Sequence, residues 1–311
     1  RNDMQAAVVP SGHIFAKRTA SASLSLPAYR EEQWHGRNQL KFINRLAESW
    51  GKDLNDFTGK MADLKARIIR KDKLIMNLTA DAVGLRLLAD AVGPVLAELS
   101  DDRFTISEAS IPALSPRTGV VIPAQVSYLA EAFPAPTYGS ELAAPLFVLS
   151  RLLANGYLYK KIRVEGGAYG GMCQYDPTGG VFSFLSYRDP HLERTLAVYD
   201  DALRFAEKGA IPHEEIQKAV IGSIGALDRP MDPVSRGFAS MIRYFSGLTD
   251  EERKKFRLAV LSMDDKALSE KALAYLIRVK DKAAVAVYAE GEKMYAANTT
   301  LQPPLRIETL T

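Results

Sequence analysis

Cysteine and histidine are scarce in this sequence of 311 residues, which has one cysteine and four histidines. The single cysteine, Cys173, cannot form a disulfide within the chain or supply a cysteine-based zinc site alone. No two histidines show the spacing of the zinc motifs H-E-x-x-H or H-x-x-E-H. The hydrolase pattern G-x-S-x-G is also absent. We therefore expect no metal site in this chain, and we expect Cys173 to be a buried core residue.

Long apolar stretches and an excess of charge of one sign are missing as well. No run approaches the ~18 consecutive apolar residues of a transmembrane helix, and residues 1–10 lack the apolar segment of a signal peptide. Lys and Arg number 40 against 37 Asp and Glu, a net charge of +3. We therefore expect neither a membrane nor a nucleic acid as partner. The length suggests about two domains or one large one.

The first hundred residues are expected to mix strands and helices. Apolar spacing, turn residues and caps predict strand material over 5–26 with a turn at Pro10–Gly12, helices over 31–50 and 54–68, a short buried strand over 74–78, and a helix capped by Asp81. Residues 101–118 contain Pro112 and Pro116 and are predicted to form a linker.

The remaining residues are predicted to begin with strands and to continue mainly as helices. The pattern predicts a half-buried strand over 122–130, a long helix over 140–163 with Pro145 near its start, strands over 169–175 and 181–187, helices after Pro190, Pro212 and Pro233, a strand over 283–288 and a helix from Gly291.

Two stretches of the chain echo each other. Ile69–Lys73 reads I-R-K-D-K and Ile277–Lys282 reads I-R-V-K-D-K, and each precedes a predicted strand and helix. The two stretches are either equivalent ends of two related α/β domains or charged helix ends that are similar by chance. On the first interpretation, residues 1–100 are only the second half of a domain.

A glycine cluster follows the long predicted helix. Gly166, Gly167, Gly170 and Gly171 lie within six residues, and each glycine loses extra backbone entropy when the chain becomes ordered. The cluster is either a site where a peptide approaches the main chain or a helix end with a tight turn. On the first interpretation, Gly166, Gly167, Ala168 and Gly170 contact the substrate.

Two polar side chains flank this cluster. Arg163 offers a fixed fork of N–H donors and Tyr169 an O–H donor. Converging on one oxygen, they would form an oxyanion clamp. The alternative makes Arg163 a partner of the helix dipole and Tyr169 an ordinary strand aromatic.

Three segments carry a family resemblance. Leu158–Gly171 (L-Y-K-K-I-R-V-E-G-G-A-Y-G-G), Gly180–Pro190 (G-V-F-S-F-L-S-Y-R-D-P) and Leu227–Pro233 (L-D-R-P-M-D-P) resemble the C-terminal half of the pitrilysin/insulinase zinc peptidases, in the presequence-protease branch. The likeness is sharpest over 120–290 and extends more loosely to the start, where the Pro10–His13 turn looks like the family's third domain.

The resemblance implies an α+β fold of two related α/β roll domains, the first of them partial. Residues 1–100 would be the C-terminal part of the third domain, 101–118 a linker and 119–311 the fourth domain. In the family, four such domains form two halves that close around a chamber. The first half carries the zinc ligands, whereas the second carries an Arg and a Tyr that match Arg163 and Tyr169.

The implied function is that of a zinc metallopeptidase that degrades short unfolded peptides. Arg163 and Tyr169 would be its catalytic residues in this chain, stabilising the oxyanion of the scissile carbonyl. Its partner would be the zinc-bearing N-terminal half of the same protein, and this part alone would hold no zinc and be inactive. The alternative is a non-catalytic scaffold or partner subunit of an insulinase-like assembly. A bacterial cytoplasm is the expected location, with an organelle matrix as the alternative.

Overall fold

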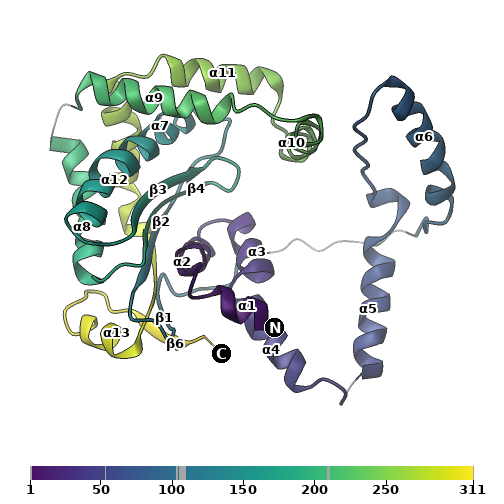
Figure 1. Cartoon of the computed structure of the whole chain (residues 1–311), viewed down its shortest axis with the longest axis horizontal. Coiled ribbons are helices and arrows are strands. Elements are labelled where there is room, and N and C mark those ends of the chain that lie inside the picture. The colour runs from purple at the N-terminus through teal and green to yellow at the C-terminus, as the bar shows by residue number, and fades with distance from the viewer. Residues whose placement is uncertain (1, 53, 103, 105–109, 209–210, 311) are drawn as a thin grey trace. The chain divides into compact units, whose positions relative to one another are not determined.

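The structure is a computed structural model that describes residues 2–52, 54–102, 104, 110–208 and 211–310 (Figure 1). The chain forms two compact units. Unit 1 comprises Arg1–Asn44, Ser110–Asp228 and Asp250–Thr311, and unit 2 comprises Arg45–Ala109 and Arg229–Thr249. The division of the chain into a partial third domain and a fourth domain concerns family relationship rather than compactness, and it stays a prediction.

Unit 1 is built on one mixed six-stranded sheet with the strand order β3-β4-β2-β5-β1-β6. Its strands are β1 (Arg117–Val121), β2 (Tyr128–Pro134), β3 (Gly170–Asp176), β4 (Val181–Tyr187), β5 (Ala284–Ala289) and β6 (Arg306–Thr309). β1 pairs in parallel with β5 and β6, and the other neighbours are antiparallel. β3 and β4 form a hairpin at one edge of the sheet.

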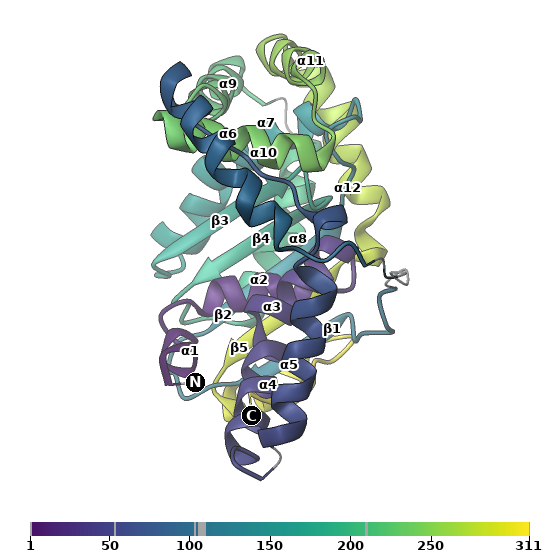
Figure 2. The same cartoon turned by 90° about the vertical axis from the view of Figure 1, so that its right-hand side faces the viewer.

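Helices cover both faces of this sheet, so alternate residues of each central strand enter two different cores. One face carries α7 (Ala143–Leu153), η2 (Ala154–Val164), α8 (Glu193–Lys208), α9 (His213–Leu227), α11 (Asp250–Leu261), η3 (Ala267–Leu273), α12 (Ala274–Arg278) and α13 (Gly291–Ala297). The other carries α1 (Asn2–Ala7), α2 (Gly12–Ser21), α3 (Leu26–His35) and the start of α4 (Arg37–Glu48). Figure 2 shows α2 lying across the strands.

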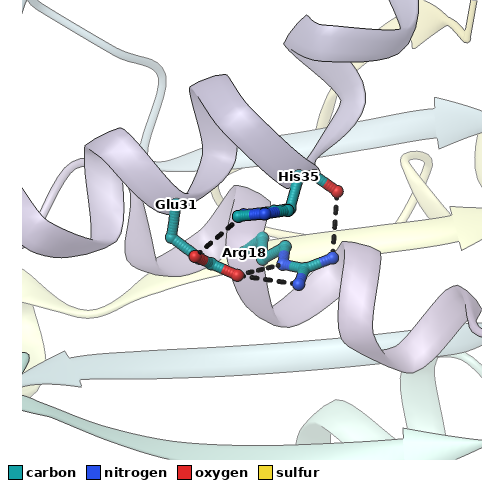
Figure 3. Close-up of polar contacts among 3 residues, drawn as sticks. All are labelled: Arg18, Glu31 and His35. Atoms are coloured by element: carbon teal, nitrogen blue, oxygen red, sulfur yellow. Dashed lines mark hydrogen bonds and ion pairs between the residues drawn. The ribbon is translucent and has the colours of Figure 1, made fainter. Parts of the chain in front are cut away.

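A polar network ties α3 to α2 (Figure 3). The Arg18 guanidinium donates to Glu31 Oε1 at 2.7 and 3.0 Å and to the His35 carbonyl at 2.9 Å. His35 Nδ1 lies 3.1 Å from Glu31 Oε2. Burial raises the pKa of Glu31, but the hydrogen bonds and positive charges of Arg18 and His35 together outweigh burial, and the pKa falls below its ordinary value. The charged network therefore holds two helices in a fixed relation on the sheet.

Unit 2 contains α5 (Leu54–Ile68), η1 (Lys71–Lys73), α6 (Ala82–Ala97) and α10 (Pro233–Ser246). Among the described residues of this unit, only Arg70 is buried. The Asn77 side-chain amide donates to the Gly237 carbonyl, which connects the segment before α6 to α10. The predicted Asp81 cap is confirmed, because its carboxylate accepts the Gly84 N–H at 2.7 Å. No helix in the described ranges is both long and apolar enough to span a membrane.

The predicted strand material over 5–26 is wrong, because these residues form α1, α2 and the start of α3. Phe15, Ala16 and Ala20 of α2 are buried against the sheet. Ser25, counted as part of an alternating strand, instead caps α3 by accepting the Ala28 N–H at 3.3 Å. Small and apolar residues alternate over 21–26 as they would in a strand, but this segment is the junction of two helices.

Two further strand predictions need correction. Leu74–Leu78 forms no strand, and Leu74, Ile75 and Met76 are exposed rather than buried. The strand predicted over 122–130 begins only at Tyr128, and the residues before it connect it to β1. β1 was not predicted, and its first two residues lie in the predicted linker over 101–118. The hairpin prediction holds, because β3 and β4 match the predicted strands within one residue, and the long helix predicted over 140–163 runs over Ala143–Val164. The single helix predicted over 31–50 is instead two helices, α3 and α4, which separate at Gly36.

The echoed stretches have a shared local structure. Lys71–Lys73 and Lys280–Lys282, both K-D-K, each form one turn of 3-10 helix. Extended chain and then a helix follow in both places, but only the second extended segment pairs into a sheet, as β5. The local repeat is real, and its origin in a domain duplication stays a prediction.

Candidate functional site

The candidate site lies where a long helix turns into the edge strand β3. α7 continues without a break into η2, which is wound as a π-helix and carries Arg163 next to its last residue. The Gly167 N–H donates to the Arg163 carbonyl at 3.1 Å, and the Ala168 N–H donates to the Ile162 carbonyl at 3.1 Å. Tyr169 follows and enters the hairpin by donating its N–H to the Tyr187 carbonyl at 3.1 Å.

At three of the four glycine positions the structure explains why a side chain is excluded. Gly167 adopts φ of 76°, a left-handed conformation that ends the helix and that side chains disfavour. A Cβ on Gly166 would lie 2.6 Å from the Ile162 carbonyl oxygen. A Cβ on Gly171 would lie 2.8 Å from both the Ile162 Cβ and the Leu158 carbonyl oxygen. The helix end packs too closely on β3 for side chains at these positions.

Gly170 differs from its neighbours, because the nearest atom to an added Cβ would be the Tyr187 Cβ at an ordinary 3.8 Å. Ala168 is 3% exposed and belongs to the hydrophobic core. Substrate contact at Gly166, Gly167, Ala168 and Gly170 stays a prediction. Among the glycines of this set, Gly170 is the one at which neither packing nor backbone conformation excludes a side chain.

Arg163 and Tyr169 both present free polar groups to solvent. Tyr169 is 68% exposed, and Arg163 is exposed. Their side chains make separate contacts: the Arg163 guanidinium lies over the Tyr159 ring at 5.5 Å, one turn earlier on η2, whereas Tyr169 lies against Tyr187. Within the described part of the chain, neither side chain has an ion pair or hydrogen bond, so both donors remain available for a ligand.

Tyr169 belongs to a group of stacked side chains with Tyr187 and Arg188. The rings of Tyr169 and Tyr187 meet edge to face, with centroids 6.5 Å apart. The Arg188 guanidinium lies 5.6 Å from the Tyr169 centroid and 5.5 Å from that of Tyr187. Behind Tyr187 lie the rings of His13, at 4.7 Å, and Tyr128, at 5.8 Å.

Sequence reasoning did not assign a role to Arg188 or Tyr187. The available signal was the S-Y-R-D-P segment, which was used only as evidence of resemblance. His13 was not predicted to join this group either, because the residues of α2 were expected to form strand material. His13 brings the helix covering the other face of the sheet to the base of this group, and burial lowers the pKa of its imidazole.

The helix end beside Arg163 is rich in cations. Lys161 Nζ pairs with Glu165 Oε2 at 2.8 Å, which raises the pKa of the lysine and lowers that of the glutamate. Arg194 donates to the Glu165 carbonyl at 3.1 Å and thereby satisfies a carbonyl at the helix end. Because the carboxylate of Glu165 is engaged by Lys161, Arg163 keeps its positive charge available.

The described residues of this chain do not fit a zinc site. Within the described ranges, no group of three or more His, Cys, Asp or Glu side chains is placed to hold a metal ion. His35 contacts Glu31, and His213 contacts Gln217 at the start of α9. Cys173 is buried, as expected, and desolvation raises the pKa of its thiol far above the ordinary value, which disfavours the thiolate that a nucleophile requires.

A family model described as the PreP C-terminal domain matches residues 117–290, from the first residue of β1 to the residue after β5. The match covers more than half of the chain and includes the whole helix-to-strand site. The chain belongs to the PreP C-terminal domain family. The resemblance to the presequence-protease branch of the insulinase peptidases is therefore confirmed.

Curated relatives of this PreP C-terminal domain chain are presequence proteases. Presequence protease 1, chloroplastic/mitochondrial, of Arabidopsis thaliana is 32% identical over 291 residues, which are 93% of this chain and 27% of that protein. The mitochondrial presequence protease of Yarrowia lipolytica is 32% identical over 277 residues, 87% of this chain and 27% of that protein. The chain spans about a quarter of the length of these relatives.

A solved structure shares the fold. The M16 peptidase inactive domain from Pseudomonas fluorescens superimposes with a TM-score of 0.50 and 17% identity, covering 66% of this chain and 51% of that one. The predicted α+β roll of the insulinase type is thus confirmed for this PreP C-terminal domain chain.

Proposed function

We propose that this chain acts as the C-terminal part of a zinc-dependent endopeptidase that degrades short unstructured peptides in a closed chamber. Arg163 and Tyr169 supply the donors that stabilise the oxyanion of the scissile carbonyl. The observation that carries this proposal is the pair of unpartnered donors on either side of one tight turn, inside the segment that matches the PreP C-terminal domain.

The two donors suit an oxygen that gains negative charge. The Arg163 guanidinium offers several N–H groups in a plane, and the Tyr169 hydroxyl offers one further donor. Donors fixed in advance stabilise a developing oxyanion more than the neutral carbonyl. Loss of one such donor typically lowers the rate ~10²- to 10³-fold.

Zinc, in this proposal, is bound by the N-terminal half of the same protein, because the described residues of this chain offer no ligand set. The role of this chain is to bind and orient the peptide carbonyl. By itself it is expected to bind no catalytic zinc and to cleave no peptide. This expectation also makes the N-terminal half its obligatory partner.

The names of the relatives bear on location. Those from Arabidopsis thaliana and Yarrowia lipolytica are named as chloroplastic/mitochondrial and mitochondrial. They support the organelle matrix, which the sequence analysis gave as the alternative, and lend no support to a bacterial cytoplasm. We propose the organelle matrix as the site of action.

The test is cleavage of an unstructured quenched-fluorescence peptide by the full-length protein, with and without a zinc chelator. Arg163→Ala and Tyr169→Phe should each lower kcat ~10²- to 10³-fold. Arg204→Ala on α8 and Tyr295→Phe on α13 are matched controls at exposed positions away from the turn, and both should leave kcat unchanged.

The alternative is a non-catalytic scaffold or partner subunit of an insulinase-like assembly. The free donors of Arg163 and Tyr169 favour the peptidase over the scaffold, because a scaffold has no need of an oxyanion clamp. A well-folded full-length protein that cleaves no peptide, with or without added zinc, would favour the scaffold. Cleavage that both site variants leave unchanged would refute the roles of Arg163 and Tyr169.

A further inference from the structure

Arg188 has an unusual backbone. Among the described residues, Arg188 is the only one other than glycine with a positive φ, which is 48°. Residues with a Cβ avoid this left-handed region, and such a conformation persists where the surroundings enforce it, often at functional sites. A glycine would adopt the same conformation without strain. Some advantage of the arginine side chain therefore has to offset the strain.

The chain is fixed on both sides of Arg188. Before it, the Tyr187 carbonyl accepts the Tyr169 N–H at 3.1 Å. After it, Asp189 exchanges two backbone hydrogen bonds with Ser127, at 2.7 and 2.8 Å. The buried Asp189 carboxylate also accepts the Thr195 hydroxyl at 2.8 Å. These bonds enforce the left-handed turn and fix the direction in which the Arg188 side chain leaves the sheet.

That direction leads to the tyrosine of the proposed oxyanion clamp. The Arg188 guanidinium lies over the rings of Tyr169 and Tyr187, at 5.6 and 5.5 Å from their centroids, within the range of cation–π attraction. No carboxylate of the described chain forms an ion pair with it. Tyr169 has few other supports, since it is 68% exposed and stands at the edge of the sheet.

We propose that Arg188 is a positioning residue that holds the Tyr169 ring, and with it the donating hydroxyl, in one orientation. Tyr187 is the second support of the ring and is itself backed by His13 and Tyr128. This inference rests on the proposed function. It adds that the left-handed turn at Arg188 places a cation against the ring of Tyr169, where the same guanidinium also contacts Tyr187 and acts on the Tyr128 hydroxyl.

The test is a double-mutant cycle in the full-length protein, with kcat and KM for the quenched peptide as readouts. Arg188→Ala should lower kcat about 10-fold with little change in KM, because a misplaced donor fails mainly in the transition state. In the Tyr169→Phe background the same change should have no further effect, since no hydroxyl remains to be positioned. A merely structural role would instead lower kcat in both backgrounds.

Two further variants separate the side chain from the backbone. Arg188→Gly relieves the strained φ, so it should melt at a higher temperature than Arg188→Ala and yet lose as much kcat. Arg188→Lys keeps a cation and should restore kcat to within about 3-fold of wild type. Arg204→Ala serves as the control for loss of an exposed arginine.

The outcomes distinguish this inference from the proposed function. If the wild-type protein cleaves nothing, the proposed function fails and the inference falls with it. If the wild type is active and Tyr169→Phe is impaired, but Arg188→Ala keeps its kcat, the inference alone is overturned. An equal loss in the wild-type and Tyr169→Phe backgrounds would also overturn it, because Arg188 would then act independently of the Tyr169 hydroxyl.

Discussion

Two adjacent glycines at the start of β3 should respond in opposite ways to the same substitution. In Gly171→Ala the new Cβ would lie 2.8 Å from the Ile162 Cβ and 2.8 Å from the Leu158 carbonyl oxygen. The second of these atoms is helix backbone, which cannot turn aside, so η2 has to move off the strand. Overpacking of this kind costs about 1–3 kcal/mol of unfolding free energy.

Gly170→Ala is the matched control, because its nearest contact would be an ordinary 3.8 Å to the Tyr187 Cβ. Removing a glycine stiffens the unfolded chain, so this variant should be unchanged or more stable by up to ~1 kcal/mol. Urea unfolding followed by circular dichroism measures both. A Gly171→Ala protein as stable as wild type would refute the account of close packing between η2 and β3.

Gly170→Ala also decides whether the glycine cluster contacts the substrate or only forms a tight turn at the helix end. If Gly170 contacts the substrate, as predicted, Gly170→Ala should raise KM in the full-length protein while leaving stability intact. If the glycines serve packing alone, Gly170→Ala should leave KM and kcat unchanged. Stability and KM together therefore separate the two interpretations at a single position.

Three further perturbations test other parts of unit 1. Gly12→Ala would place a Cβ 2.3 Å from the Tyr128 ring and should destabilise the protein by roughly 1–3 kcal/mol or more in urea unfolding, whereas Gly139→Ala, with nothing within 4 Å, should not. Burial raises the pKa of Glu131 from 4.5 to about 8. Because the folded state holds this proton more tightly than the unfolded state, the contribution of Glu131 to the free energy of unfolding is fully present below pH 4.5 and is lost as the pH rises towards 8. Glu131→Gln should flatten this pH dependence in urea unfolding. Cys173, with its buried thiol, should react with a thiol-specific reagent only after unfolding, and fast reaction of the folded protein would contradict its burial.

The sequence predicted best where several signals agreed. The hairpin of β3 and β4 combined β-rich runs with a Pro-Thr-Gly-Gly turn, and α6 and α10 each began at an aspartate that does cap the helix. The long helix carrying Arg163 was also predictable from its apolar spacing. Its π winding was not, because π turns are rare and no residue pattern in this segment signals one.

Predictions failed where tertiary packing decides. Residues 12–21 contain small residues that suit either a strand or a helix, and burial of Phe15 on the sheet selects the helix. The apolar run 74–78 has the composition of a buried strand but no neighbouring strand among the described residues, so it is neither paired nor buried. Arg163 and Tyr169 could be named as candidates from the sequence, and their catalytic roles stay a prediction, whereas Arg188 could not be named because it stands out by a backbone conformation that no spacing reveals.

The π winding of η2 makes the length of this segment as important as its composition. A π turn holds one more residue between hydrogen-bonded partners than an α turn does. Deletion of one residue within Ala154–Tyr157 could therefore be absorbed by a return to α-type bonding, and the helix would survive. Every side chain beyond the deletion would then keep its direction relative to α7, because the shortened segment closes the same turn with one residue fewer. An extra residue inserted into a turn that keeps its winding would instead rotate Arg163 by about 100° away from the glycine turn, so lengthening this segment would abolish the site in a chain that is still helical.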